Sequence, residues 1–370
     1  MFRVADIKYA VRRMDWFMMA SVFILICVGI SFIYSAAFRG DSSTVYPFYK
    51  KQIGWALVGL AVYLGVMTFD YGLLRRYVWG LYGMGLILLL LVFVVGTRVH
   101  GAYRWLNVGV NIQPSELAKL STIVALAAYL GRPDLDVYSP RSTITALVIV
   151  GVPFLLIAME PDLGTAMVLV PVTLVMLFMA GVPWRILALI LLAGAMLMPL
   201  AWLGLDEYQR NRIMVFWDPA SDPLGVGWNK IQSEIAVGSG GLFGKGFLNG
   251  TQNILGFLPR TVAPTDFIFS VIAEECGFAG SVGLLALYGW LVGRGSSIAL
   301  VARDRFGQLL VTGIATMLFA HIFVNVAMTI GMMPITGLPL PLVSYGGSFM
   351  VSTMLALGLL QSVYVRRYRY

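Results

Sequence analysis

Long apolar runs alternate along the chain with short polar connections. A helix needs about 20 mostly apolar residues to cross the hydrocarbon core of a bilayer. The alternation of apolar and polar positions that is typical of outer-membrane barrels is absent. The pattern predicts ten transmembrane helices, at residues 16–36, 52–69, 78–96, 115–130, 143–159, 162–181, 185–204, 266–292, 308–331 and 341–363.

The composition agrees with this pattern and sets the class of protein. The 370 residues are 59% hydrophobic and only 12% charged, whereas soluble domains are about 25% charged. Within lipid, each segment must satisfy its own backbone amides, so the apolar runs are predicted to be helices. We therefore predict an all-α integral membrane protein. A single polytopic membrane domain, 1–370, would carry one long extracytoplasmic loop, 206–265, between helices 7 and 8.

The net charge of +8 reports topology and does not indicate nucleic acid. An even number of crossings places both termini on one side of the membrane. Most of the basic residues fall on that side, which the positive-inside rule assigns to the cytoplasm. These residues are Arg3, Lys8, Arg12, Arg13, Arg75, Arg76, Arg132, Arg141, Arg185, Arg294, Arg303, Arg305, Arg366, Arg367 and Arg369.

The long loop 206–265 is rich in glycine and aromatic residues and is predicted to form an ordered cap on the outer leaflet. Within it, "NKIQSEIAVG" places Ile231, Ile235 and Ala236 on one helical face, which predicts a short interfacial helix. The glycine-rich "GSGGLFGKG" does not match a nucleotide-binding P-loop, because Ser239 and Gly246 occupy two of its required positions. We interpret it as a turn-rich lid.

Asp266 follows this loop and is predicted to be the first residue of a helix. Two interpretations are open. The carboxylate could stabilise the positive amino terminus of that helix, with Thr265 as its cap. It could instead be a general base at the membrane surface. Glu274 and Glu275, two turns deeper, are interpreted as structural, with one of them paired to a cation.

Other charged residues gather near the same face. Arg104 precedes a span that opens with "QPSELAK", where Glu116 and Lys119 share a helix face as either a structural ion pair or substrate ligands. Asp162 could cap the next helix or belong to a site.

Arg210 and Arg212 could hold lipid, but we favour a clamp on the pyrophosphate of a lipid-linked substrate.

Residues 332–348, "MMPITGLPLPLVSYGGS", predict a broken or re-entrant segment in which Ser344 could contact a substrate. No metal-ligand spacing stands out, and neither HExxH nor CxxC occurs. The sequence thus predicts no cofactor, and whether the protein requires a divalent cation stays open.

Together these motifs resemble the shape, elongation, division and sporulation (SEDS) family, and its rod-elongation branch more than its division branch. The resemblance is carried, in order, by "RWL", "QPSELAK", "PDLGT", "YQRNR", "DPASDPLGVGWNKIQSEIAVGSGG", "GKGFLNGTQ", "FLP", "TDFIFSVIAEECG" and "PLPLVSYGGS". It covers most of the chain. One departure is Arg260, which stands after "FLP" where many relatives have Glu, and "TVAP" lengthens the run to Asp266.

The resemblance implies a peptidoglycan glycosyltransferase that polymerises lipid II at the outer face of the bacterial cytoplasmic (inner) membrane during elongation. It implies a class B penicillin-binding protein, a transpeptidase, as partner. The family's essential aspartate matches Asp266, and its other motif residues match Arg104, Glu116, Lys119 and Asp162. A flippase for the same lipid, or a noncatalytic scaffold for the partner, are the alternative functions.

Overall fold

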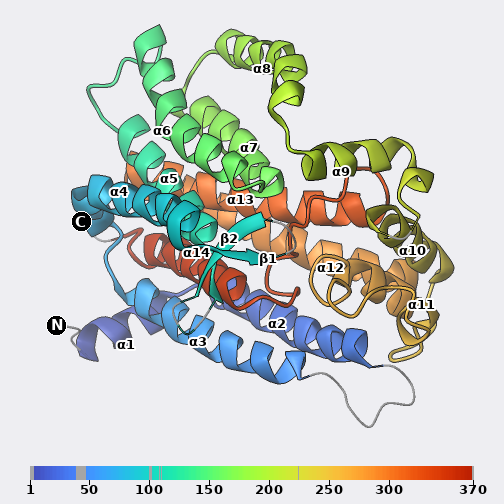
Figure 1. Ribbon diagram of the computed structural model, residues 1–370. Helices are drawn as coiled ribbons and strands as arrows, with labels where there is room; N and C mark the ends of the chain where they lie inside the picture. Colours follow the sequence, from blue (N-terminus) through green and yellow to red (C-terminus); the bar gives the residue numbers. More distant parts are fainter. Residues whose placement is uncertain are drawn as a thin grey trace.

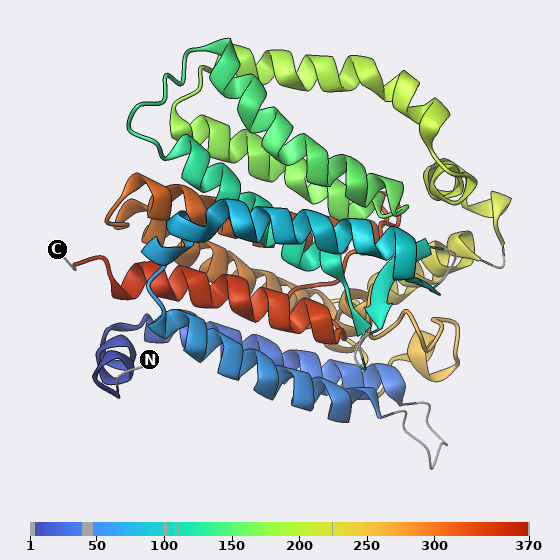
Figure 2. The same ribbon diagram turned by 60° about the vertical axis from the view of Figure 1, so that its left-hand side comes forward.

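The computed structural model describes residues 4–38, 47–99, 102–107, 109, 111–223 and 225–368. Its long helices run roughly side by side, so the molecule is a bundle with two ends (Figures 1 and 2). The elements are α1 (Val4–Arg13), α2 (Trp16–Ala37), α3 (Phe48–Thr68), α4 (Gly72–Val95), β1 (Thr97–Val99), β2 (Ala102–Asn107), β3 (Asn111–Ile112), α5 (Pro114–Leu130), α6 (Pro140–Met159), α7 (Leu163–Ala180), α8 (Trp184–Gly204), α9 (Glu207–Trp217), η1 (Pro219–Ser221), α10 (Val226–Ser239), α11 (Thr251–Ile254), α12 (Ile268–Leu300), α13 (Arg305–Thr329) and α14 (Gly347–Val365).

Nine helices in the described part of the chain are long and apolar enough to cross a membrane, against ten predicted. The difference concerns α5, which matches the predicted span 115–130 but is only 17 residues long. A helix of that length still reaches about 25 Å, close to the thickness of a bilayer core. Because α5 packs along α4 and is buried over nearly its whole length, it is a central helix of the bundle.

Both termini lie at the same end of the bundle (Figures 1 and 2). Arg367, just after α14, donates a hydrogen bond of 3.3 Å to the backbone oxygen of Arg13, just before α2. The chain therefore makes an even number of passes between these points, which requires α5 to be counted. We call this end of the bundle the proximal end and the opposite one the distal end.

The predicted loop 206–265 folds into α9, η1, α10 and α11, which lie together at the distal end (Figure 1). The helix predicted in "NKIQSEIAVG" is confirmed as α10. Ile231 and Ile235 share an exposed face of α10, the face with which an interfacial helix would contact lipid, whereas Ala236 is buried. Ser233 also faces inward, and its hydroxyl bonds to the backbone oxygen of Thr329 at 2.8 Å.

A small antiparallel sheet interrupts the otherwise helical chain between α4 and α5. The strands lie in the order β1-β2-β3, with Thr97 opposite Trp105 and Leu106 opposite Ile112. The hydrophobic pattern of the sequence predicts no strand here. The sheet matters for the site because β2 carries Arg104.

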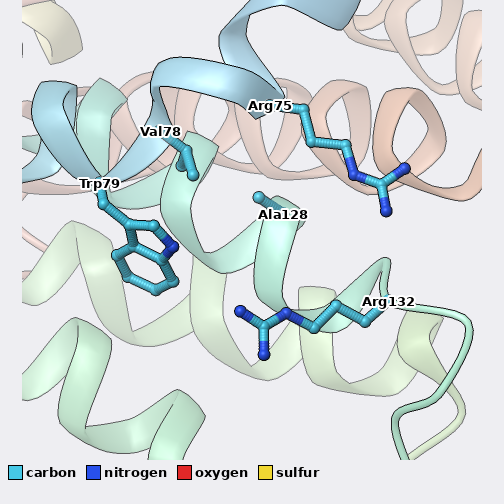
Figure 3. Close-up of a pocket in the computed structure, with 5 residues that line it drawn as sticks. All are labelled: Arg75, Val78, Trp79, Ala128 and Arg132. Atoms are coloured by element: carbon cyan, nitrogen blue, oxygen red, sulfur yellow. The ribbon is translucent and has the colours of Figure 1, made fainter.

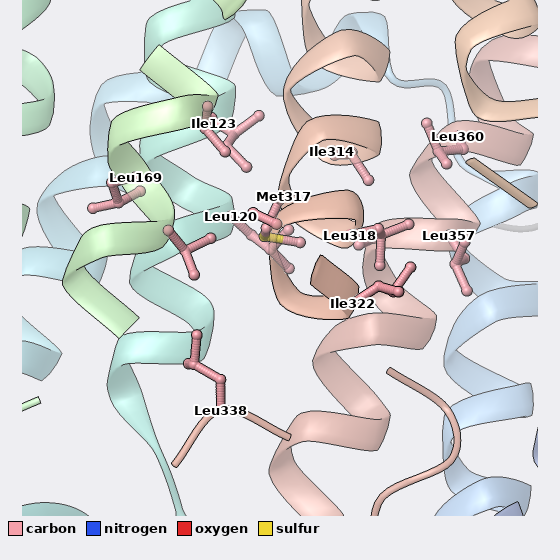
Figure 4. Packing of buried hydrophobic residues seen from close by; sticks show 14 of the residues in the cluster. Leu120, Ile123, Leu169, Ile314, Met317, Leu318, Ile322, Leu338, Leu357 and Leu360 are labelled. Carbon is pink, nitrogen blue, oxygen red and sulfur yellow. The ribbon is translucent and has the colours of Figure 1, made fainter. Parts of the chain in front are cut away.

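The core lies where α5, α7, α13 and α14 meet, and Figure 4 shows leucine and isoleucine side chains from these helices interdigitating. By contrast, α8 has no buried residue and lies at the edge of the bundle, where Ile186, Leu187 and Ile190 near its start pack against the core. Between α13 and α14 the chain is non-helical, as the prolines and glycines of 332–348 predicted. Leu338, Leu340 and Leu342 of this segment are buried, so protein shelters its irregular backbone.

Candidate functional site

Asp266 lies at the distal end, in the turn 261–267 that leads into α12. Its predicted place as the first helical residue is wrong, because α12 begins two residues later at Ile268. Thr265 does not cap that helix either. Its hydroxyl points back and bonds to the carbonyl oxygens of Thr261 and Val262. The carboxylate therefore stands on a turn, outside the regular helix.

This turn is fixed by hydrogen bonds from two other elements. Three consecutive carbonyl oxygens accept them: Pro264 O from Tyr345 N at 2.8 Å, Thr265 O from Ser344 Oγ at 2.5 Å, and Asp266 O from Asn325 Nδ2 at 2.9 Å. Asn325 belongs to α13, and it also donates to the backbone oxygen of Leu338 at 2.7 Å. The turn, α13 and the segment before α14 are thus held as one unit.

Ser344 was predicted as a substrate ligand, but the structure places it in this framework. It is 1% exposed, and its hydroxyl accepts a hydrogen bond from Leu340 N while donating to Thr265 O. Gln52 of α3 donates to its backbone oxygen at 3.1 Å. A hydroxyl bonded in this way positions the turn of Asp266.

Arg212 of α9 approaches Asp266 beside Gly337. A Cβ atom placed on Gly337 would lie 3.5 Å from Arg212 Nη1 and 3.5 Å from Asp266 Oδ2. The guanidinium and the carboxylate therefore border the same small space. Gly337 also has a φ of +76°, a conformation that side chains other than glycine rarely adopt. Arg212 is held there by the carbonyl oxygens of Ile335 and Thr336, at 3.2 and 2.8 Å.

Arg210 does not join Arg212, so the predicted two-arginine clamp is not formed. Residues two apart on a helix do not face each other. Arg210 turns back to donate to Leu203 O at 2.8 Å. It borders an open depression of about 590 Å³ together with Glu207, Tyr208 and Asn211.

A second polar cluster at the distal end joins β2 to the connection between α6 and α7. Asp162 caps α7 by accepting from Thr165 N, as one of its two interpretations predicted. Its other oxygen accepts from Thr165 Oγ1 and from Gln113 Nε2. Arg104 Nη1 lies 3.8 Å from the same carboxylate. The Arg104 guanidinium also donates to the backbone oxygens of Glu160 and Pro161. The two clusters adjoin, because a Cβ on Gly164 would lie 2.9 Å from Thr336 O.

Glu160, which is not among the site residues predicted from the sequence, lies in this second cluster and is 1% exposed. Neither of its carboxylate oxygens has a hydrogen bond within the described residues. Burial, followed by the nearby Asp162 carboxylate, raises the pKa of Glu160 to about 8, and the opposing effect of Arg104 is smaller. The side chain is therefore a carboxylic acid that keeps its proton near neutral pH. The only indication of Glu160 in the sequence is its place two residues before Asp162 in the motif "EPDLGT".

Glu116 and Lys119 form the ion pair that their spacing predicted, with Lys119 Nζ 2.9 Å from Glu116 Oε1. Lys119 is fully buried. Its ammonium lies 2.7 Å from His321 Nε2 of α13, and Ser352 of α14 donates to Glu116. Both members of the ion pair contact side chains of neighbouring helices, His321 of α13 and Ser352 of α14. The geometry therefore favours the structural interpretation of the pair. His321 was missed as a partner because it is distant in sequence.

Glu274 and Glu275 take part in structural contacts. Glu274 accepts from Lys245 Nζ at 2.7 Å, and Glu275 accepts from Ser35 Oγ at 2.5 Å. Lys245, from the rejected nucleotide-loop motif, thus ties the lid to α12. Arg260 is exposed. Among the residues that the structure describes, no group of three His, Cys, Asp or Glu side chains is placed to hold a metal ion.

These features define a multi-pass helical membrane protein with a carboxylate and arginines gathered at one end. The family model FtsW/RodA/SpoVE, described as cell cycle protein, matches residues 15–369. The chain is 42% identical to the peptidoglycan glycosyltransferase MrdB of Escherichia coli K12 over 320 residues, 86% of each chain.

Two solved structures resemble the whole bundle. One is a chain of a peptidoglycan synthase complex described as coordinating polymerization and crosslinking. It has 34% identity and a TM-score of 0.81, over 96% of this chain and 99% of that one. The other is the rod shape determining protein RodA of Thermus thermophilus. It has 31% identity and a TM-score of 0.71, over 96% and 98%.

The chain belongs to the FtsW/RodA/SpoVE family, the SEDS family that its motifs resemble. It is a multi-pass bacterial membrane protein and a glycosyltransferase.

Proposed function

We propose that this protein polymerises lipid II into peptidoglycan glycan strands during cell elongation, with Asp266 as the general base. One observation carries the proposal. The carboxylate of Asp266 and the guanidinium of Arg212 border one space at the distal end, on a turn that three hydrogen bonds hold in place. A base and a cation fixed in this way suit a transfer from a pyrophosphate donor.

The reaction would proceed by direct displacement. Asp266 accepts the proton of a sugar hydroxyl on the acceptor, and that oxygen attacks the anomeric carbon of the donor. The bond to polyprenyl pyrophosphate breaks, and the anomeric centre inverts. Arg212 offsets the charge on the leaving pyrophosphate, because guanidinium groups bind phosphate oxygens in a fork-like geometry. Arg104, which is already paired with Asp162, would act as a secondary cation.

The proposed orientation places the proximal end in the cytoplasm and the distal end outside. Arg75, Arg132 and Arg294 are among the basic residues near the proximal end, as the positive-inside rule requires for a cytoplasmic side. The lipid tail of the substrate would stay in the bilayer while its sugars reach Asp266. The membrane would be the bacterial cytoplasmic membrane.

A class B penicillin-binding protein is the proposed partner, and it would crosslink the strands that this protein makes. The support comes from the related chain that was solved within a peptidoglycan synthase complex. That complex is described as coordinating two activities, polymerization and crosslinking. A polymerase and a transpeptidase acting on one strand account for the two activities.

The test is polymer formation from labelled lipid II in detergent by the purified protein, with and without a cognate class B partner. Wild type should form glycan strands, and Asp266→Asn should reduce the rate by about 10²–10⁴-fold, the usual contribution of a general base. Asp134→Asn is the matched control, because Asp134 is exposed between α5 and α6 at the other end. Melting temperatures would verify that each variant is folded.

Each outcome decides a different part of the proposal. Polymer from a folded Asp266→Asn variant at the wild-type rate would remove Asp266 as the base. A wild type that forms no polymer even with a competent partner would point to transport or scaffolding instead.

A further inference from the structure

A separate pocket lies at the proximal end, between the beginning of α4 and the end of α5. Arg75, Val78 and Trp79 line it from α4, and Ala128 and Arg132 line it from α5 and the residues that follow (Figure 3). Its volume is about 130 Å³, the liquid volume of about four water molecules and enough for a phosphate group. The proposed catalytic groups have no part in it, because the length of α5, about 25 Å, separates the two ends.

The pocket carries two positive charges that no acidic side chain of the described residues neutralises, and the Arg132 guanidinium lies 5.4 Å from the centroid of the Tyr129 ring. Within the described part of the chain, neither Arg75 nor Arg132 has an ion pair, and no hydrogen bond is found for either guanidinium. Two other proximal arginines have acidic partners. Arg294 pairs with Asp15, and Arg366 lies 3.8 Å from Asp70.

Figure 3 shows the two arginine side chains on either side of Ala128, with no acidic residue among those that line the pocket. Two like charges that border one pocket repel each other, and an anion between them would relieve that repulsion. Arg75 also lies in the first turns of α4, where the helix dipole favours negative charge.

The remaining surfaces of the pocket are apolar. Val78 is buried, and Ala128 is also buried. Trp79 is half-exposed, and tryptophan rings commonly lie at the level of lipid headgroups. Basic pockets between transmembrane helices on the cytoplasmic side are a recognised form of lipid headgroup site.

We propose that Arg75 and Arg132 bind a phosphate group in this pocket, supplied either by an anionic phospholipid or by free phosphate. The two guanidinium groups bind the phosphate oxygens from α4 and from the end of α5. Val78, Ala128 and the Trp79 ring contact the apolar part of a lipid. The bound anion would hold these two helix ends together at the membrane surface.

The test is calorimetric titration of the delipidated protein in neutral detergent. The probes are short-chain phosphatidylglycerol, short-chain phosphatidylcholine and inorganic phosphate. Wild type should bind phosphatidylglycerol saturably. The double variant Arg75→Gln, Arg132→Gln should bind it with an affinity about 30-fold lower. Arg141→Gln with Arg185→Gln is the matched control. It removes the same charge from exposed positions that do not line the pocket.

The probes separate the two sources of phosphate. Saturable binding of phosphatidylglycerol without binding of inorganic phosphate identifies a lipid site, and equal binding of both identifies a site for free phosphate. Arg75→Lys with Arg132→Lys keeps the charges without the fork geometry and should give an intermediate affinity. Wild-type affinity in the Arg75→Gln, Arg132→Gln variant would overturn the proposal. An equal loss in the control, or no binding of either anion, would also overturn it.

Discussion

Glu160 is a buried carboxylic acid in the connection between α6 and α7, close to Asp162 and Arg104. Its pKa of about 8 in the folded protein compares with an ordinary value of 4.5. Between these two pH values the folded state holds a proton that the unfolded chain has lost. The folded state is therefore favoured at low pH, and this contribution declines by roughly 1.4 kcal/mol per pH unit until the pH passes about 8.

Glu160→Gln should remove this dependence, because an amide has the same shape and does not titrate. We expect the melting temperature of wild type in detergent to fall more steeply than that of the variant between pH 5 and 8. The variant should therefore become the more stable protein as the pH rises above about 4.5, and the difference should stop growing above about pH 8. Glu207→Gln is the control, since Glu207 is exposed in α9. Parallel melting curves for wild type and Glu160→Gln would show that Glu160 is already ionised at pH 5.

At this scale, contacts that depend on local spacing could be predicted from sequence, and long-range contacts could not. The cap at Asp162 and the pair of Glu116 with Lys119 span three residues each, so helix geometry alone brings them together. Arg212 bonds Tyr208 within α9, but the two carbonyl oxygens that hold it beside Asp266 lie more than 100 residues away, in the segment before α14. No local pattern shows that Arg212 turns to Asp266 while Arg210 turns away.

Among the elements, one buried carboxylate is a main side-chain link between the lid at the distal end and α12. Glu274 is fully buried in α12, and it accepts hydrogen bonds from Lys245 Nζ, Thr251 Oγ1 and Gln252 N. A kink at Gly277 brings α12 against this lid, where a Cβ would lie 2.3 Å from Gly244 N. The lysine and the glutamate therefore join α11 and the lid to α12.

Lys245→Met should destabilise the protein by about 3 kcal/mol, because it leaves a buried carboxylate without its cation. The measurement is the melting temperature in detergent. Adding Glu274→Gln to Lys245→Met should restore part of the loss, since the unpaired charge is then gone. Lys51→Met is the control, from an exposed lysine in the first turn of α3. If the double variant were less stable than Lys245→Met alone, the cost would lie in lost hydrogen bonds and not in the unpaired charge.

The existence of the helices was easier to predict than their ends. The apolar runs identify α2, α7 and α13 because a bilayer accepts few other patterns. The first residues of α12 and α14 were placed two and six residues too early. Hydrogen bonds from other elements to the residues just before these helices decide where they begin. The strands β1, β2 and β3 are too short for their periodicity to stand out.

For the whole molecule, the bilayer constrains the architecture, but it does not determine which helices are neighbours. The number of passes follows from the apolar runs, including the short α5 that the contact between Arg367 and Arg13 requires. The extensive packing of α14 on α3 joins segments almost 300 residues apart, and nothing in either sequence indicates it. The position of α8 at the edge of the bundle is likewise a property of the assembled fold.

The proposed reaction also requires a definite orientation of the whole molecule, with the distal end outside the cytoplasm. Cys27→Ser and Cys276→Ser would remove both cysteines of the chain. Arg260→Cys would then place one thiol in the exposed distal loop, and Arg141→Cys one at the exposed proximal start of α6. A membrane-impermeant maleimide on intact spheroplasts should label Arg260→Cys, and it should label Arg141→Cys only after the membrane is opened. The reverse labelling would place Asp266 in the cytoplasm, where a base could not act on sugars exported to the outer face.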